Sequence, residues 1–113
     1  MTISVIGLNH KSANIDIRGK FSFTADNASL LLRRIKKVED ILEVIVVSTC
    51  NRTEIYCESA NGADDIKNWL LSEKEYKSFA KHLYIHQEED AIEHLFKVVA
   101  GLDSMVIGES EVL

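Results

Sequence analysis

The sequence contains no proline, and its two cysteines and five glycines are scattered through 113 residues. Because no proline-, glycine- or serine-rich stretch separates one part of the chain from another, the length predicts a single domain. No apolar run approaches the roughly 20 residues that a membrane-spanning helix needs. The residues after Met1 show neither the basic segment nor the cleavage site of a signal peptide. These absences predict a cytoplasmic protein without a membrane segment, whose cysteines are reduced thiols.

Positive charge is also scarce in this chain. Lys and Arg number 13 against 18 Asp and Glu, which gives a net charge of −5. Binding nucleic acid by charge alone requires clustered bases, so the composition argues against it. One basic cluster does occur, at residues 33–37. We interpret it as the end of a helix, where the helix dipole favours cations, in preference to a phosphate-binding patch.

Apolar periodicity predicts the order β-α-β-β-α-β-α along the chain. The expected strands are 2–8, 44–47, 53–58 and 82–86, and the expected helices are 24–38, 64–71 and 88–100. This order predicts an α+β fold with a ferredoxin-like antiparallel sheet (β-α-β-β-α-β) and flanking helices. The strands 44–47 and 53–58 are expected to form a hairpin or tight corner around Asn51.

Two of these segments carry more detailed predictions. The β-branched run 44–47 is typical of a strand covered on both faces, although the ferredoxin-like order would place it at a sheet edge. In 53–58, period-two alternation separates an apolar face (Thr53, Ile55, Cys57) from a second face (Glu54, Tyr56, Glu58). On the last helix, the predicted core stripe consists of Ile92, Leu95, Phe96 and Val99.

Cys50 is the strongest candidate for a catalytic residue, because it follows a predicted strand at the start of a turn. Arg52 could favour its thiolate, which is the attacking form of a cysteine. The alternative is that Cys50 is a small buried hydrophobic residue, which is how we interpret Cys57. The spacing of the two cysteines, without a C-x-x-C pair, predicts no metal site.

Among the histidines, His94 is the most informative. It is expected between the buried stripe and the solvent-exposed face of its helix. There it is either a structural histidine whose hydrogen bonds are satisfied or a catalytic acid or base. His82 and His86 share the predicted strand with Tyr84, and we expect that face to be solvated. The stretch 101–111 is hard to explain by packing alone, because two glycines frame an apolar run that ends in carboxylates. No glycine-rich turn that would cradle a nucleotide phosphate is visible in the sequence.

Three motifs carry a family resemblance, in the family's order: Gly7–Ala13 (GLNHKSA), Ser48–Tyr56 (STCNRTEIY), and His94–Phe96 (HLF) leading to Gly101–Glu109 (GLDSMVIGE). On these residues the sequence resembles the N-terminal catalytic domain of glutamyl-tRNA reductase. The resemblance implies that a cysteine attacks the ester joining glutamate to tRNA, giving a thioester that NADPH reduces to glutamate-1-semialdehyde. That reaction is the first step of the five-carbon route to tetrapyrroles (porphyrins).

The resemblance also implies roles for individual residues. Cys50 is the expected nucleophile, and His94 the histidine that supports activity. Arg52 is expected to pair with a substrate carboxylate. The expected substrate-binding residues are Thr49, Asn51, Arg52, Ser104, Glu109, Ser110 and Glu111. Position 111 departs from the family pattern, because this sequence has Glu111 where the family commonly has Gln.

Family members continue into an NADPH-binding domain and a helical dimerisation domain. Because this chain stops at Leu113, residues 1–113 are expected to be a truncated catalytic domain that forms the thioester without completing the reduction. The expected partners of the full-length protein are glutamyl-tRNA, a second copy in a homodimer, and glutamate-1-semialdehyde aminomutase as a channelling partner. NADPH is the expected cofactor, bound by a domain outside the chain.

Two other functions compete with this one. A ferredoxin-like module could bind an amino acid for regulation, with Cys50 as an incidental thiol. A thiol-dependent hydrolase could instead pass its acyl group to water, and it would turn over without NADPH.

Overall fold

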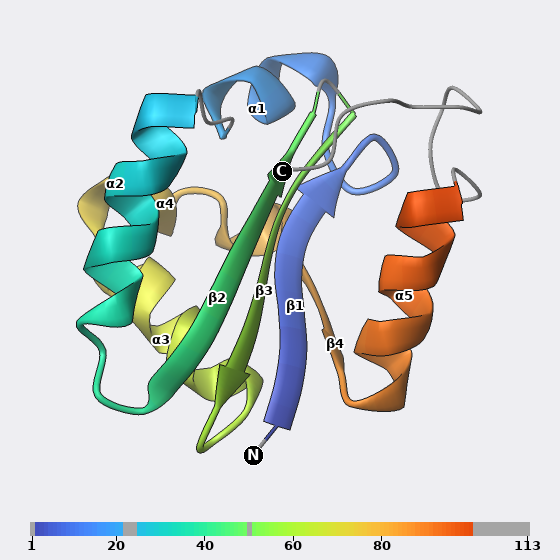
Figure 1. The fold of residues 1–113 in the computed structure, drawn as a ribbon. Coiled ribbons are helices and arrows are strands. Elements are labelled where there is room, and N and C mark those ends of the chain that lie inside the picture. The colour runs from blue at the N-terminus through green and yellow to red at the C-terminus, as the bar shows by residue number, and fades with distance from the viewer. Residues whose placement is uncertain (1, 22–24, 50, 101–113) are drawn as a thin grey trace.

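The computed structural model describes residues 2–21, 25–49 and 51–100. One four-stranded antiparallel sheet has the order β2-β3-β1-β4 (Figure 1). The strands are β1 (Thr2–Asn9), β2 (Ile41–Ser48), β3 (Arg52–Ser59) and β4 (Tyr84–Gln87). The helices are α1 (Ile15–Lys20), α2 (Ala25–Lys36), α3 (Ala63–Ser72), α4 (Lys74–Lys77), the 3₁₀ turn η1 (Ala80–His82) and α5 (Glu89–Ala100).

The ferredoxin-like fold predicted from the element order is confirmed. The hairpin between β2 and β3 is confirmed as well, with Ser48 opposite Thr53 and Asn51 in the connecting turn. The prediction missed α1, α4 and η1, because each is too short to show a periodic apolar stripe. It also began the last strand two residues early, since His82 belongs to η1 and β4 begins at Tyr84.

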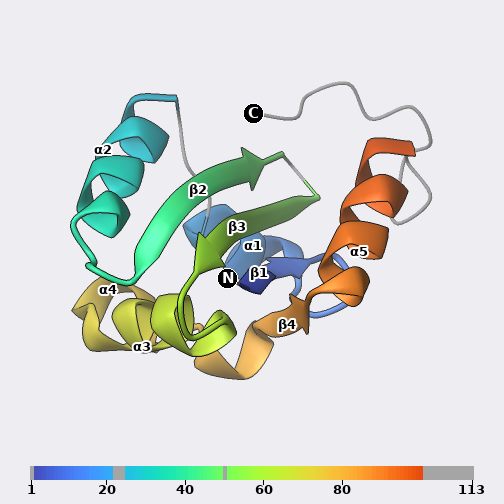
Figure 2. The same ribbon diagram turned by 60° about the horizontal axis from the view of Figure 1, so that its bottom comes forward.

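Helices cover both faces of the sheet. Figure 2 shows α2 and α3 on one side of the sheet and α5 on the other. The main core lies under α2 and α3, where Ile35 and Ile66 pack against Ile6 and Ile55 of the central strands. A smaller cluster lies under α5 and consists of Val5, Val47, Tyr56 and Ala91.

The expectation that 44–47 is covered on both faces is met at Val46 and Val47, which are buried on opposite faces, and is wrong at Ile45. The strand β2 lies at the edge of the sheet. Ile45 points to the face that carries α5, but the helix does not cover it, and its side chain is 57% exposed. Val46 is buried because it lies on the opposite face, under α2 and α3. Apolarity on both sides of a strand therefore did not indicate a central position here.

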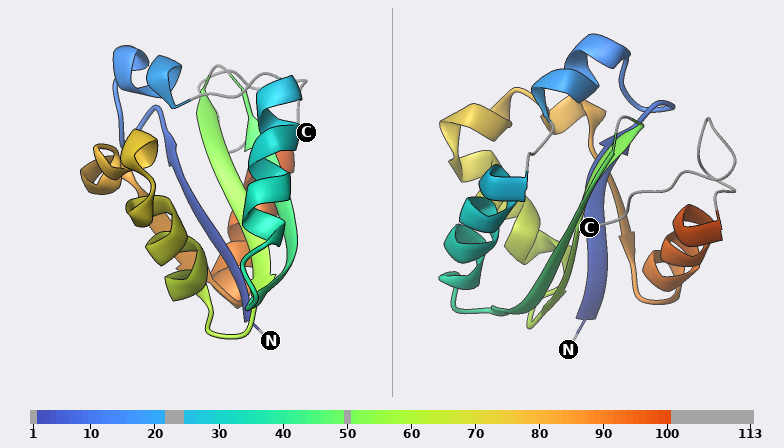
Figure 3. Two further views of the ribbon diagram at one scale, coloured as in Figure 1. Left: turned by 90° about the vertical axis from the view of Figure 1, so that its left-hand side faces the viewer. Right: turned by 45° about the horizontal axis from the view of Figure 1, so that its top comes forward.

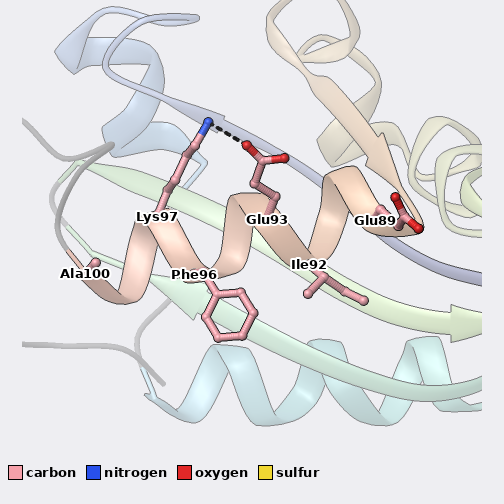
Figure 4. A pocket seen from close by; sticks show the side chains of 6 residues that line it. All are labelled: Glu89, Ile92, Glu93, Phe96, Lys97 and Ala100. Carbon is pink, nitrogen blue, oxygen red and sulfur yellow. Dashed lines mark ion pairs between the residues drawn. The ribbon is translucent and has the colours of Figure 1, made fainter.

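The predicted core stripe of α5 is also wrong. The helix buries Ala91, His94 and Val98 against the sheet, whereas Phe96 is 70% exposed. Figure 4 shows Ile92 and Phe96 projecting from one side of α5, with the Glu93–Lys97 ion pair on the other side. The reason is the polar character of the sheet face beneath: the helix turns its small residues and its histidine toward the polar side chains that stand on β3 and β4.

The short helix α1 lies at the end of the sheet where β1 ends (Figures 1 and 3). The side chain of Asn14 caps it by accepting a hydrogen bond from the backbone N–H of Ile17 at 3.0 Å. The chain reaches this cap through a turn in which Asn9 Oδ1 accepts from the backbone N–H groups of Lys11 and Ser12. This turn fixes where Lys11 stands relative to the sheet end.

The interpretation of the basic cluster as a helix end is confirmed. Arg33, Arg34 and Lys36 occupy the last turn of α2. Arg34 donates to Glu73 at 2.6 Å and to Glu75 at 2.8 Å. Among the residues that the structure describes, no helix combines the length and apolarity required to traverse a bilayer.

Candidate functional site

The candidate site lies between the sheet and α5, and the alternation of β3 builds it. Ile55 and Cys57 point toward the main core, which confirms the predicted apolar face for these two residues, and Thr53 is buried on the same face. Arg52, Glu54 and Tyr56 occupy the opposite face. All three are buried, and Arg52 and Glu54 are both 0% exposed. A buried arginine and glutamate on one strand are unusual enough to require an explanation.

Glu54 is the centre of a hydrogen-bonded cluster drawn from three elements. From its own strand, Tyr56 Oη donates to Glu54 Oε1 at 3.0 Å. From β4, Tyr84 Oη donates to Glu54 Oε2. From α5, His94 Nε2 lies 2.5 Å from the same oxygen, and the Arg52 guanidinium Nη1 lies 3.7 Å from it. Four polar groups thus compensate the burial of one carboxylate.

Gly7 makes this arrangement sterically possible. In the sheet register, Gly7 of β1 stands opposite both Glu54 of β3 and Tyr84 of β4. A Cβ at Gly7 would lie 2.5 Å from the carbonyl oxygen of Thr53 and 2.8 Å from Glu54 Cγ. Because glycine has no side chain, the Glu54 side chain can cross β1 and reach the partners on β4 and α5.

The electrostatics of the cluster keep Glu54 ionised. Burial raises the pKa of Glu54, but hydrogen bonds from His94 and Tyr84, followed by the positive charges of His94 and Arg52, outweigh it, so the pKa lies below its usual value. Burial, together with the adjacent Glu54 carboxylate, raises the pKa of Tyr84, which therefore stays protonated as a donor. An ionised carboxylate only accepts hydrogen bonds, so Nε2 of His94 carries a proton. In the neutral ring, the basic lone pair is then at Nδ1.

Two further aromatic rings flank His94. The His86 ring stacks on the His94 ring with centroids 4.7 Å apart, and the Tyr84 ring lies 5.4 Å from it. The expectation that His82 and His86 share a solvated face is therefore wrong. His86 and Tyr84 are half-buried in the candidate site, and His82 lies in η1 with Nδ1 3.3 Å from the Ser12 carbonyl oxygen.

Three of the predicted site residues that the structure describes, Thr49, Asn51 and Arg52, lie at the β2–β3 turn. The Thr49 backbone N–H donates to the Arg52 carbonyl oxygen at 2.8 Å, and the Asn51 N–H donates to Thr49 Oγ1 at 3.2 Å. Asn51 is buried, and Arg52 leads directly to Glu54. His94 comes from α5 and meets this group through Glu54. Cys50, Ser104, Glu109, Ser110 and Glu111 lie outside the described residues.

The interpretation of Cys57 as a core residue is confirmed. It is buried in the main core, and its Sγ lies 3.3 Å from Ser4 Oγ. Burial raises the pKa of the Cys57 thiol, which disfavours the thiolate. Among the described residues, no group of three or more His, Cys, Asp or Glu side chains could hold a metal ion.

Sequence reasoning missed the roles of Glu54, Tyr84 and Gly7. Glu54 lies within the motif Ser48–Tyr56 and Gly7 within the motif Gly7–Ala13, yet neither residue was assigned a role. The available signal was the glutamate on an alternating strand two residues after an arginine. It is a weak signal, because such a pair also occurs on solvated strand faces.

Comparison with known proteins places this chain in a family. Residues 6–113 match the family described as "Glutamyl-tRNAGlu reductase, N-terminal domain". The glutamyl-tRNA reductase of Brevibacillus brevis is 46% identical, and the alignment covers 100% of this chain and 26% of the relative. That of Heliobacterium mobile is 43% identical, with 100% of this chain and 27% of the relative covered.

A solved structure agrees at the level of the fold. The glutamyl-tRNA reductase from Methanopyrus kandleri superimposes with a TM-score of 0.70 at 24% identity, over 95% of this chain and 24% of that chain. The chain spans about a quarter of the length of the relatives it matches. By the extent of these matches, the chain belongs to the glutamyl-tRNA reductase N-terminal domain family.

Proposed function

We propose that this chain accepts the glutamyl group of glutamyl-tRNA on Cys50 as a thioester, the first half of an NADPH-dependent reduction to glutamate-1-semialdehyde. The observation that carries the proposal is the buried Glu54–His94 pair at 2.5 Å, built on the strand that leaves the Thr49–Arg52 turn. An imidazole held by a buried carboxylate is a typical partner of a nucleophilic thiol. The family membership adds that the relatives' names specify the same substrate.

The proposed step balances without a metal. The Cys50 sulfur forms a bond with the ester carbonyl carbon, and the bond from that carbon to the ribose oxygen breaks. His94 takes the thiol proton at Nδ1 and returns it to the leaving ribose oxygen. Glu54 acts through His94: by accepting from Nε2–H, it fixes the tautomer and the ring orientation that this transfer requires.

Substrate recognition is proposed for the residues around the turn. Arg52 is proposed to pair with the carboxylate of the glutamyl group, with Thr49 and Asn51 beside it; because its guanidinium is fully buried next to Glu54 in this structure, that contact requires the site to open when the substrate binds. Ser104, Glu109, Ser110 and Glu111 are proposed to complete the binding site.

Reduction of the thioester is assigned to other parts of the full-length protein. NADPH supplies a hydride when it is bound. In the described part of this chain, β1 leads into the Asn9–Ser12 turn and not into a glycine-rich phosphate-binding turn, so these residues do not fit the cofactor. We further propose that the full-length protein is a cytoplasmic homodimer that passes its product to glutamate-1-semialdehyde aminomutase.

Intact mass after mixing with glutamyl-tRNA in the absence of NADPH tests the proposal. We expect one glutamyl adduct, removed by hydroxylamine, on the wild type and on the Cys57→Ser control, and none on Cys50→Ser. An adduct on Cys50→Ser, or no adduct on the wild type, contradicts the proposal. Steady release of glutamate from tRNA by the wild type without NADPH would instead favour the hydrolase, and binding of glutamate without any adduct would favour the regulatory module.

A further inference from the structure

We propose that the cavity beside His94 binds a phosphate group of the tRNA acceptor end; this inference rests on the proposed function. The cavity has a volume of about 350 Å³. It is lined by Asn9, Lys11, Ser12, Tyr84, His86, His94 and Lys97. Two lysines and two histidines thus converge from the β1–α1 turn, β4 and α5.

The charge of the cavity contrasts with that of the chain. Acidic residues outnumber basic ones by 18 to 13 overall, yet none of the described residues lining this cavity is acidic. Lys97 does pair with Glu93 at 3.3 Å, on the side of α5 opposite Ile92 and Phe96 (Figure 4), but both side chains are exposed, so the pair constrains the ammonium group weakly. The two lysine ammonium groups of the cavity favour an anionic ligand, and the Glu54 carboxylate behind His94 is already neutralised by its own hydrogen-bond and charge partners.

The structure of the β1–α1 turn supports a formed site. Asn9 is buried, and its Oδ1 accepts from the backbone N–H of Lys11 at 2.9 Å and of Ser12 at 3.2 Å. Ser12 Oγ in turn accepts from the Asn9 N–H at 3.0 Å. These reciprocal bonds hold the turn that carries Lys11, one of the residues that line the cavity.

Chemistry favours phosphate over carboxylate as the bound group. Lysine ammonium groups act as point charges that suit phosphate, whereas a bidentate arginine suits a carboxylate. In an aminoacyl-tRNA, the nearest phosphate is fixed one ribose away from the ester carbon. Because the cavity shares His94 with the candidate site, a substrate ester brought to His94 places that phosphate next to Lys11 and Lys97.

The salt dependence of binding tests the inference. The probes are a short single-stranded RNA ending in CCA and, separately, NADPH, which is the other phosphate-bearing molecule in the proposed reaction. For RNA, the slope of log K against log salt should be shallower by about 0.7 in Lys11→Gln/Lys97→Gln, because the two lysines neutralise one phosphate and each neutralised phosphate on a single strand contributes about 0.7. Affinity at low salt should fall by roughly an order of magnitude or more.

The charge-matched control is Lys74→Gln/Lys77→Gln on α4, which lies on the other side of the sheet from α5. It should bind the RNA with the wild-type slope. An unchanged slope in Lys11→Gln/Lys97→Gln, or no binding of RNA by the wild type, overturns the inference. The inference is also overturned if Lys11→Gln/Lys97→Gln weakens the binding of NADPH but leaves the binding of RNA unchanged. Thioester formation by the wild type is read separately by mass, so failure of the phosphate site is distinguishable from failure of the proposed function.

Discussion

Replacing Glu54 by glutamine is expected to lower the free energy of unfolding by about 3 kcal/mol, as is typical when one partner of a buried ion pair is removed. Glutamine keeps the shape and can still accept from Tyr84, but it leaves the fully buried Arg52 guanidinium without the carboxylate that stands 3.7 Å away. The matched control is Tyr56→Phe, which deletes a single hydrogen bond to the same carboxylate and should cost about 1 kcal/mol. Urea denaturation measures both.

The pH dependence of the difference in unfolding free energy between the wild type and Glu54→Gln provides an internal check. The folded-state pKa of Glu54 lies below its usual value of 4.5, so the stabilisation is fully present above that pH. It is lost as the pH falls through the folded-state pKa, because the unfolded state then binds more protons than the folded state. The gap between wild type and Glu54→Gln should therefore be largest near neutral pH and shrink on acidification. A gap that is constant with pH would show that Glu54 is not held as an anion.

Replacing Gly7 by alanine should destabilise the domain by about 3 kcal/mol through overpacking. The new Cβ would meet the Thr53 carbonyl oxygen at 2.5 Å and Glu54 Cα at 2.9 Å. Both atoms belong to the backbone of the neighbouring strand, so relief requires the sheet itself to move. The side chain of Glu54 would be displaced with it, because its Cγ lies 2.8 Å from the same position.

Gly19→Ala is the control for this substitution. Gly19 lies within α1, and a Cβ added there meets nothing within 4 Å. Alanine should therefore stabilise the chain by roughly 0.5–1 kcal/mol, since it lowers the entropy of the unfolded state and favours the helix. Urea unfolding followed by the fluorescence of Trp69, the only tryptophan, compares the two variants. Equal midpoints for Gly7→Ala and wild type would contradict the account of why Gly7 is there.

Local patterns were sufficient to predict most of the architecture. Each pattern depends only on residues close together in the sequence: the alternation of 53–58, the β-branched run at 44–47 and the apolar periodicity of the helices. Together they predicted the order of the elements, and that order predicted the ferredoxin-like sheet. The orientation of α5 could not be predicted in that way. Amphipathicity assigns the more apolar face to the core, but here the sheet face beneath is polar around Glu54 and apolar beside Val5 and Val47, so the helix packs through Ala91, His94 and Val98.

The candidate site was predictable only in part for a similar reason. Position 50 and His94 could be singled out because a cysteine after a strand and a histidine at a helix border are local features. Glu54 could not, because its burial depends on Gly7 being its register partner and on Tyr84 and His94 lying across β1. Those relations connect Glu54 to residues up to 47 positions away, and no local pattern encodes them.

The most direct test of the central claim, that Glu54 orients His94 for proton transfer at Cys50, is the pH profile of single-turnover thioester formation. The wild type, Glu54→Gln and Tyr56→Phe would be compared from about pH 6 to 9, under conditions in which all three are folded. We predict that Glu54→Gln is slower by about 100-fold at neutral pH, within the range that general acid–base catalysis supplies. The deficit should narrow at alkaline pH, where thiols ionise without a base. A Glu54→Gln profile that coincides with the wild-type profile in rate and shape would contradict the claim.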